Sequence, residues 1–225
     1  MKRLHVLHLG AADETLTLTP QQSHHLVHVM RAEIGTRVVL FDGEHRQGIA
    51  ELVSADGDAA RVRVLTVEHI PPQPVRMTLL LGLPKNPATD LALRMATEAG
   101  VSCVLPVWAE RTQGRPDRHE RWNRILASAA QQCGRADLPE LHAPQRLTDA
   151  LSAIEPGTVL LYGARAGLPP PRKSAPDVAL AIGPEGGWSP AELEELQRRG
   201  GHPVSLGPYI LRTETAVAIG IARCR

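Results

Sequence analysis

Two glycine-rich segments near the C-terminus constrain this chain more than any other feature. The first is GPEGGWSPAELEEL at residues 183–196, and the second is LGPYILRTETA at residues 206–216. Each follows a short apolar run, at 178–182 and 204–206, which is typical of a buried β-strand. Two strands that end in tight turns before helices indicate an open α/β sheet, in which ligands bind beyond the carboxyl ends of the strands. We therefore expect the two turns to form two walls of one site.

The residues of the first turn specify its shape. Its glycines tolerate positive φ and leave no Cβ between the backbone and a ligand. Ser189, Pro190 and Glu192 match an N-cap, a first helical position and a capping box, which together fix where the next helix begins. A turn of this kind without any ligand is the competing interpretation. Neither the phosphate-binding GxxxxGK[ST] pattern nor the dinucleotide-binding GxGxxG pattern is present, which argues against those two functions.

The second turn contains three large apolar residues, Tyr209, Ile210 and Leu211, where polar residues are expected. The polar start of a helix follows at Arg212 and Thr213. An apolar turn beside a polar helix start can hold a ligand that has a flat base and a polar tail. The alternative is that the apolar residues fill the core and that Thr213 only caps its helix.

A proline-rich segment at 71–74 divides the chain into two expected domains. Before it, short strands, one helix at 20–30 and a hairpin turn at Asp42-Gly43 predict a small β-barrel over residues 1–70. After it, strands alternate with helices over residues 75–225, which favours a mostly parallel sheet and an α/β fold. The strands are expected at 4–9, 15–18, 37–41, 47–53, 60–67, 77–81, 101–107 and 158–162, with a Gly/Pro-rich loop at 163–171.

Composition excludes several classes of protein. No apolar run reaches the length of a membrane span, and the N-terminus lacks the apolar region of a secretory signal, so we expect a cytoplasmic protein with no membrane partner. Cys103, Cys133 and Cys224 form neither a disulfide framework nor a metal-binding pattern, and Cys133 is expected to be a buried structural thiol. His24 and His28 have the spacing of a zinc-binding pair but lack a third ligand, so no metal site is predicted.

The two C-terminal segments together resemble the signature of the ribosomal RNA small subunit methyltransferase E family, which belongs to the SPOUT class of S-adenosylmethionine enzymes. Upstream stretches agree in order, so the resemblance covers nearly the whole chain. They are HHLVHVMRAEIGTRVVLFDG at 24–43, ATDLALRMATEAGV at 88–101, LPVWAERT at 105–112 and QQCGR at 131–135. Each stretch alone is unspecific, but their combination is highly specific.

The resemblance implies a PUA-like RNA-binding β-barrel at 1–70 and a SPOUT methyltransferase domain at 75–225 with a deep trefoil knot near the C-terminus. It also implies a homodimer that holds S-adenosylmethionine in the knot. The implied reaction is methylation of uridine N3 in 16S ribosomal RNA, either as free RNA or in the small ribosomal subunit. Two alternatives stay open: a SPOUT enzyme that methylates a ribose 2′-hydroxyl, and a non-catalytic RNA-binding protein that keeps the fold.

The same resemblance assigns roles to individual residues. Uridine N3 carries an imide proton, so a base or a cation must help its removal. Arg212 is expected to stabilise the uracil anion or to bind phosphate, and Glu214 to act as a base, to orient a group or to cap its helix. Arg31, Arg111 and Arg135 are candidate RNA contacts. The residues expected to bind the cofactor are Leu161, Ile182, Gly183, Pro184, Glu185, Gly186, Gly187, Leu206, Gly207, Tyr209, Ile210 and Leu211.

The distribution of charge is compatible with RNA binding, although the formal net charge of the whole chain is only +1. Segment 111–135 contains six Arg and two acidic residues and therefore carries a charge of +4. Arg118, Arg121 and Arg124 recur every three residues, so they share one face of an expected helix. A solvated helix surface and a phosphate-binding surface account for this pattern about equally well.

Overall fold

The computed structural model describes residues 1–56, 59–169 and 177–224. They form two compact units: Met1–Pro72 with Ala130–Leu138, and Gln73–Ala129 with Pro139–Arg225. The linear division at 1–70 and 75–225 remains a prediction. The first unit also takes in residues 130–138, and no change in composition along the sequence marks this segment.

The first unit is built on a mostly antiparallel sheet with the strand order β1-β3-β4-β5-β2, in which β6 also pairs with β4. Its strands are β1 (Lys2–His5), β2 (Thr15–Thr17), β3 (Arg37–Phe41), β4 (Arg46–Asp56), β5 (Ala59–Val64) and β6 (Glu68–His69). The predicted hairpin is confirmed: β3 pairs with β4 across a turn in which Gly43 has a φ of +82°. Alternate apolar residues of these strands, such as Val38, Leu40 and Val62, form a single core.

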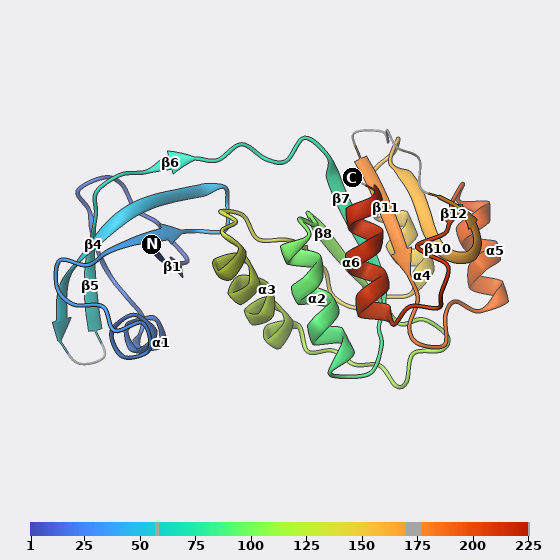
Figure 1. The fold of residues 1–225 in the computed structure, drawn as a ribbon, viewed down its shortest axis with the longest axis horizontal. Coiled ribbons are helices and arrows are strands. Elements are labelled where there is room, and N and C mark those ends of the chain that lie inside the picture. The colour runs from blue at the N-terminus through green and yellow to red at the C-terminus, as the bar shows by residue number, and fades with distance from the viewer. Residues whose placement is uncertain (57–58, 170–176, 225) are drawn as a thin grey trace. The chain divides into compact units, whose positions relative to one another are not determined.

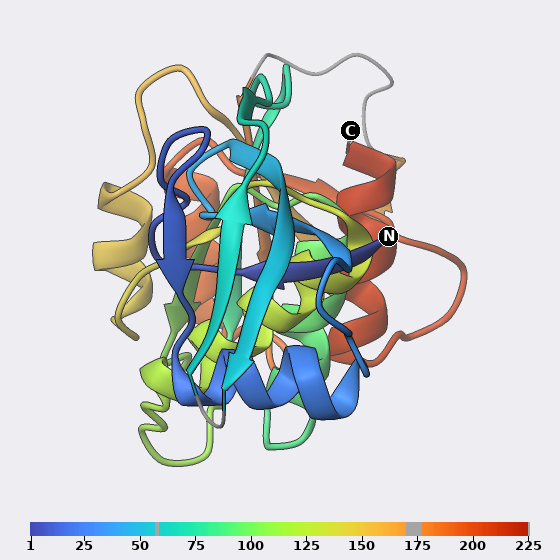
Figure 2. The ribbon, with the colours of Figure 1, turned by 90° about the vertical axis from the view of Figure 1, so that its left-hand side faces the viewer.

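The helix predicted at 20–30 begins at Pro20 as expected but changes its geometry halfway. α1 (Pro20–His24) starts with a capping box between Thr19 and Gln22, and it continues as a π-helix, η1 (His25–Val29). Figure 2 shows this helical segment, in blue, packed below the strands of its unit. The chain leaves η1 through Arg31, whose φ is +52°. A left-handed backbone strains a residue with a side chain by roughly 1–2 kcal/mol, and such strain is concentrated at functional positions.

The second unit contains a six-stranded sheet with the order β12-β10-β11-β7-β8-β9, in which every neighbouring pair is parallel. Its strands are β7 (Arg76–Gly82), β8 (Cys103–Val107), β9 (Glu140–Leu141), β10 (Val159–Leu168), β11 (Asp177–Ile182) and β12 (His202–Val204). The helices are α2 (Ala88–Glu98), α3 (His119–Cys133, of which residues 130–133 belong to the first unit), α4 (Leu147–Ser152), α5 (Pro190–Arg198) and α6 (Thr213–Cys224). This alternation confirms the predicted α/β class, whereas the trefoil knot stays a prediction.

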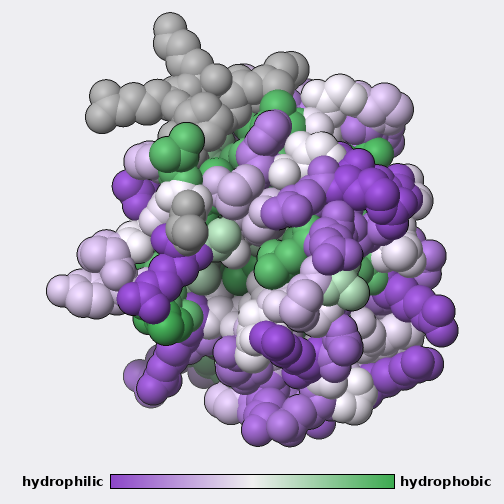
Figure 3. Space-filling view, turned by 90° about the vertical axis from the view of Figure 1, so that its right-hand side faces the viewer, coloured by the Kyte–Doolittle hydropathy of each residue, from purple (hydrophilic) through white to green (hydrophobic). Residues whose placement is uncertain are grey.

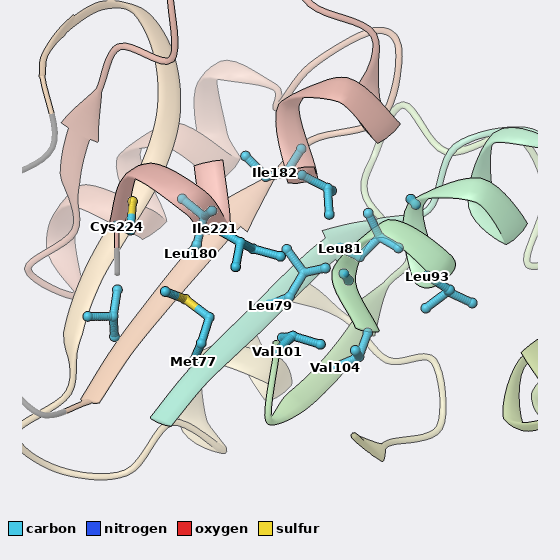
Figure 4. Packing of buried hydrophobic residues seen from close by; sticks show 14 of the residues in the cluster. Met77, Leu79, Leu81, Leu93, Val101, Val104, Leu180, Ile182, Ile221 and Cys224 are labelled. Atoms are coloured by element: carbon cyan, nitrogen blue, oxygen red, sulfur yellow. The ribbon is translucent and has the colours of Figure 1, made fainter. Parts of the chain in front are cut away.

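Helices cover both faces of the parallel sheet, and for this reason its central strands are apolar on both sides (Figure 1). On one face, Leu93 of α2 and Ile221 of α6 pack on Leu79 and Leu180 of the sheet (Figure 4). On the other face, α4 and α5 pack on residues such as Leu80. No helix in the described part of the chain is long and apolar enough to cross a membrane. The buried strands form a rigid platform for the turns at their carboxyl ends.

Candidate functional site

The two predicted turns meet at the carboxyl ends of β10, β11 and β12. β10 lies between the other two strands, so the turns that follow β11 and β12 leave from the same edge of the sheet. They border a cavity of about 380 Å³. Figure 3 views the second unit from the side of β10, β12 and α5 and shows apolar surface framed by hydrophilic residues. The residues that line the cavity are Gly163, Ala164, Arg165, Ile182, Gly183, Pro184, Glu185, Gly187, Trp188, Leu193, Leu206, Gly207, Tyr209, Ile210, Leu211, Thr213 and Ala216.

Short-range interactions hold the turn after β11 in place. The amide of Gly187 donates a hydrogen bond to the carbonyl oxygen of Pro184 at 2.7 Å, and Gly187 has a φ of +68°, which favours glycine. At Gly183, a Cβ atom would lie 3.0 Å from the backbone of Gly187. The predicted capping box is confirmed, because the Ser189 hydroxyl accepts from the amide of Glu192 at 3.2 Å and the Glu192 carboxylate accepts from the amide of Ser189 at 2.8 Å.

Two loops that follow the neighbouring strands β7 and β8 support the same turn. The amide of Lys85 donates a hydrogen bond to the Glu185 carboxylate at 3.0 Å. The guanidinium of Arg111 donates to the carbonyl oxygen of Gly186. Arg111, predicted as an RNA contact, is exposed but already has this partner in the turn. Its side chain therefore holds the loop, whatever else it binds.

The apolar residues of the second turn are at least partly exposed to solvent and do not fill the core. Tyr209 and Ile210 are 81% and 83% exposed, and Leu211 is half-buried. All three line the cavity. The Thr213 hydroxyl donates a hydrogen bond to the carbonyl oxygen of Gly183 at 3.2 Å, which joins the second turn to the first. Thr213 therefore does more than begin α6, because its side chain also links the two turns.

Ten of the twelve residues predicted to bind the cofactor line the cavity. The exceptions are Leu161, which is buried in the core, and Gly186, which faces the Arg111 side chain. The sequence did not point to Gly163, Ala164 and Arg165, because a Gly/Pro-rich loop was expected from residue 163 to residue 171, whose last two residues lie outside the described part. Instead, β10 continues to Leu168. The other lining residues not predicted as cofactor contacts are Trp188, Leu193, Thr213 and Ala216.

The two predicted catalytic residues stand in different environments. Arg212 is exposed directly before α6, whereas Glu214 is only 9% exposed in the first turn of that helix. A carboxylate in this position is stabilised by the positive end of the helix dipole. Neither residue is among those that line the cavity. The charged residues that do line it, within the described part of the chain, are Arg165 and Glu185.

Arg135, another predicted RNA contact, is engaged inside the first unit. Its guanidinium donates hydrogen bonds to both carboxylate oxygens of Asp137, with an Nε–Oδ1 distance of 3.1 Å. Burial of Asp137 opposes its ionisation, but the hydrogen bond and charge of Arg135, with a smaller effect of His45, hold the pKa of this carboxyl below its ordinary value. The pair of Arg135 and Asp137 therefore stabilises its own segment.

Cys133, the last residue of α3, is exposed, so the expectation of a buried thiol was wrong.

Comparison with known proteins identifies the family. A model described as an RNA methyltransferase domain matches residues 71–224, and one described as an RNA methyltransferase PUA domain matches residues 18–65. The chain is 32% identical to ribosomal RNA small subunit methyltransferase E of Synechocystis sp., over 94% of this chain and 73% of the relative. It is 33% identical to the protein of the same name from Mycobacterium tuberculosis, over 89% of this chain and 82% of the relative.

A solved structure agrees with these matches. The crystal structure of a ribosomal RNA small subunit methyltransferase E from Neisseria gonorrhoeae, bound to S-adenosyl methionine, superposes with a TM-score of 0.91 at 28% identity. The match covers 99% of this chain and 95% of that one, and it bears out the predicted fold class. The chain therefore belongs to the ribosomal RNA small subunit methyltransferase E family.

Proposed function

We propose that this protein transfers a methyl group from S-adenosylmethionine to N3 of a uridine in 16S ribosomal RNA. The observation that carries the proposal is the cavity bordered by the two turns after β11 and β12, in a chain of this family. The relatives are named ribosomal RNA small subunit methyltransferases, and the Neisseria gonorrhoeae protein was crystallised with S-adenosyl methionine.

The residues that line the cavity suit this cofactor. Small-molecule sites commonly measure about 300–1,000 Å³ and combine apolar walls with a few polar groups, and the 380 Å³ cavity falls in that range. Leu206 and Ile210 offer apolar surface for an adenine ring, and Gly187 leaves the backbone accessible. Arg165 and Glu185 are charges of opposite sign, which match the zwitterionic amino-acid tail of the cofactor.

The reaction needs a nucleophilic uridine N3. When bound, S-adenosylmethionine supplies a methyl group on a positively charged sulfur. The Arg212 guanidinium, exposed between the lining residues Leu211 and Thr213, can stabilise negative charge that develops on the uracil ring. Glu214 is buried, which favours a role in positioning the start of α6 over contact with RNA. Holding the base in line with the methyl group is the other large contribution expected of the protein.

Contact with RNA phosphate is assigned to Arg31 in the first unit, because its side chain is exposed and its backbone is strained. The salt dependence of RNA binding tests this assignment.

A homodimer is supported by Tyr209 and Ile210, whose exposed apolar surface a second copy can bury. Light scattering that gives the mass of one chain would contradict the dimer.

The protein is proposed to act in the cytoplasm. All three cysteines are free, in keeping with a reducing compartment. A tagged protein that localises elsewhere in the cell would refute this location.

A methyl-transfer assay tests the proposed function. Small-subunit RNA from cells that lack this enzyme is incubated with the protein and S-adenosylmethionine labelled in its methyl group. We expect label in the RNA, and labelling slower by on the order of a hundredfold when Arg212 is replaced by Ala. A protein that binds the cofactor and RNA but transfers no label would instead be a non-catalytic RNA-binding member of the family.

A further inference from the structure

Three side chains with metal-binding atoms lie together at the amino ends of strands in the second unit. The sulfur of Cys103, a carboxylate oxygen of Glu140 and an imidazole nitrogen of His142 all lie within 4.8 Å of one another. Cys103 and Glu140 are the first residues of β8 and β9. The cavity assigned to the cofactor is bordered by turns at the carboxyl ends of the same sheet, so this cluster belongs to the opposite edge.

The register of the sheet produces the cluster. Cys103 pairs directly with Glu140 in the parallel ladder between β8 and β9. Paired residues of neighbouring strands project to the same face, and so do alternate residues along one strand. His142 stands two residues after Glu140, and its amide donates a hydrogen bond to the carbonyl oxygen of Val104 at 3.1 Å. Backbone pairing therefore sets the positions of all three side chains.

The cluster opens into a second cavity, of about 150 Å³, bounded by the sheet and by the segment that follows α4. Cys103 is buried, His142 is partly exposed and Glu140 is exposed, so a small ion can enter from the solvent side. Because a water molecule occupies about 30 Å³, the cavity has room for an ion with bound water. Its lining residues are Arg76, Thr78, Cys103, Leu105, Glu140, His142, Ala153, Glu155, Thr158 and Asp177.

The contacts within the cluster favour a built site over a chance grouping. Nε2 of His142 lies 2.9 Å from Oε1 of Glu140, and the guanidinium of Arg76 lies 3.6 Å from the other oxygen of that carboxylate. Arg76, a half-exposed side chain in contact with Glu140, stands where an outer partner of a metal ligand would stand. Packing as a small apolar residue accounts for the burial of Cys103. It does not account for a carboxylate and an imidazole beside the sulfur.

We propose that Cys103, Glu140 and His142 form a binding site for Zn²⁺. Thiolate, imidazole and carboxylate are the ligand types that zinc takes in proteins, and three protein ligands with water in the fourth position are a common set. Calcium and magnesium prefer oxygen ligands, which makes them poorer candidates. Binding transfers the thiol proton of Cys103 to solvent and forms a sulfur–zinc bond. The ion would tie the two-residue edge strand β9 to β8 and leave the cofactor cavity unchanged.

Cobalt substitution tests the site on the full-length protein. The protein is stripped with a chelator, kept reduced with a phosphine and titrated with Co²⁺, and the thiolate-to-cobalt absorption band is followed before Zn²⁺ displaces the cobalt. We expect one Co²⁺ per chain with this band. Cys103→Ser should abolish the band, and both Cys103→Ser and His142→Gln should weaken Zn²⁺ binding by more than about a hundredfold, beyond the effect of losing an outer partner. Cys133→Ser, which removes an exposed thiol outside the cluster, is the matched control and should keep the band.

The variants differ in their risk of misfolding, because Cys103 is buried and His142 is partly exposed. If Cys103→Ser does not fold, His142→Gln decides. Zinc should also raise the melting temperature of the wild type by about 5–10 °C when free zinc exceeds Kd a hundredfold, and this rise should vanish in His142→Gln. A wild-type protein without the absorption band overturns the proposal, and so does a band that persists in Cys103→Ser or affinity that is unchanged in His142→Gln.

Discussion

The hydroxyl of Thr213 donates a hydrogen bond to the carbonyl oxygen of Gly183 at 3.2 Å and so connects the two turns that border the main cavity. Gly183 directly follows the strand β11, and Thr213 begins α6. The two residues are thirty positions apart in the chain, and Thr213 is almost fully buried. The bond therefore fixes the distance between the two walls of the proposed cofactor site.

Replacement of Thr213 by Val should weaken S-adenosylmethionine binding. Valine keeps the shape of threonine but cannot donate the hydrogen bond, whose net value is about 0.5–1.5 kcal/mol, which corresponds to up to about a tenfold rise in Kd. Thr213→Ser retains the hydroxyl and is the matched control. Calorimetric titration of both variants with the cofactor measures the effect. Equal affinities for the two variants would show that the bond does not shape the site.

Gly187→Ala should also weaken cofactor binding, and Gly200→Ala provides a closely matched control. Both glycines have positive φ, +68° and +79°, and a Cβ at either would meet nothing within 4 Å. The two substitutions should therefore cost similar stability, about 1–2 kcal/mol. Of these two glycines, Gly187 lines the cavity and Gly200 does not. Loss of affinity in Gly187→Ala but not in Gly200→Ala is the expected result, and equal affinities at equal stability would remove this turn from the site.

The roles of Arg212 and Glu214 can be separated by single-turnover kinetics. Arg212→Ala should slow methyl transfer by on the order of a hundredfold or more, as for loss of an electrostatic stabiliser of the transition state. Glu214→Gln should change the rate little, because the buried side chain is assigned to positioning. Rates of both variants are measured across pH at saturating cofactor. If Glu214→Gln is the slower variant and high pH partly rescues it, Glu214 is the base and the assignment is reversed.

Arg31 and Arg135 should respond differently when RNA binding is measured against salt. Arg31→Ala should weaken binding to every sequence and lower the slope of log affinity against log salt by about one, because one phosphate contact is lost. Arg135→Ala should leave that slope unchanged and destabilise the first unit, because its guanidinium is paired with Asp137. Arg31→Lys keeps the charge and serves as the control. A slope that falls only in Arg135→Ala would exchange the two roles.

Features of the site that depend on residues close together in the sequence were predicted, whereas contacts between residues far apart in the sequence were not. The capping box of Ser189 and Glu192 and the hairpin turn at Gly43 depend on residues a few positions apart, and both are confirmed. The tie from Thr213 to Gly183 depends on how β11 and α6 meet in space, which no spacing within either turn encodes. Arg165 was missed for a related reason: pairing of Gly163 and Leu168 with β12 extends β10 through a segment whose glycine content indicates a loop.

The cluster of Cys103, Glu140 and His142 was also invisible in the sequence. Its first two members are brought together by the register of two strands, and recognisable zinc motifs have shorter spacings. The prediction that Cys133 is buried was based on its place on the apolar side of the helix. It was wrong because Cys133 is the last residue of α3, where a side chain on that side can still be exposed.

The ion pair of Arg135 and Asp137 should make the free energy of unfolding depend on pH. The pKa of Asp137 is lower in the folded protein than in the unfolded chain, so the pair stabilises the fold above the unfolded value of about 3.9, and this contribution is lost as the pH falls through the folded value. Asp137→Asn should lower the free energy of unfolding at pH 7 by about 1–3 kcal/mol.

Urea unfolding at several pH values measures the difference between wild type and Asp137→Asn. That difference should be largest at neutral pH and should shrink below about pH 4. Glu44→Gln, which changes an exposed carboxyl of the same unit, should show little difference at any pH. A difference for Asp137→Asn that is constant down to strongly acidic pH would mean that ionisation of this carboxyl does not contribute.

Nucleoside analysis of the modified RNA tests the central claim most directly. Small-subunit RNA from cells without this enzyme is treated with the purified protein and S-adenosylmethionine, digested to nucleosides and separated by liquid chromatography with mass detection. The proposed function predicts 3-methyluridine, absent when the cofactor is omitted and strongly reduced with Arg212→Ala. A methyl group on a ribose 2′-oxygen, or unmodified RNA from a protein that binds the cofactor, would contradict it.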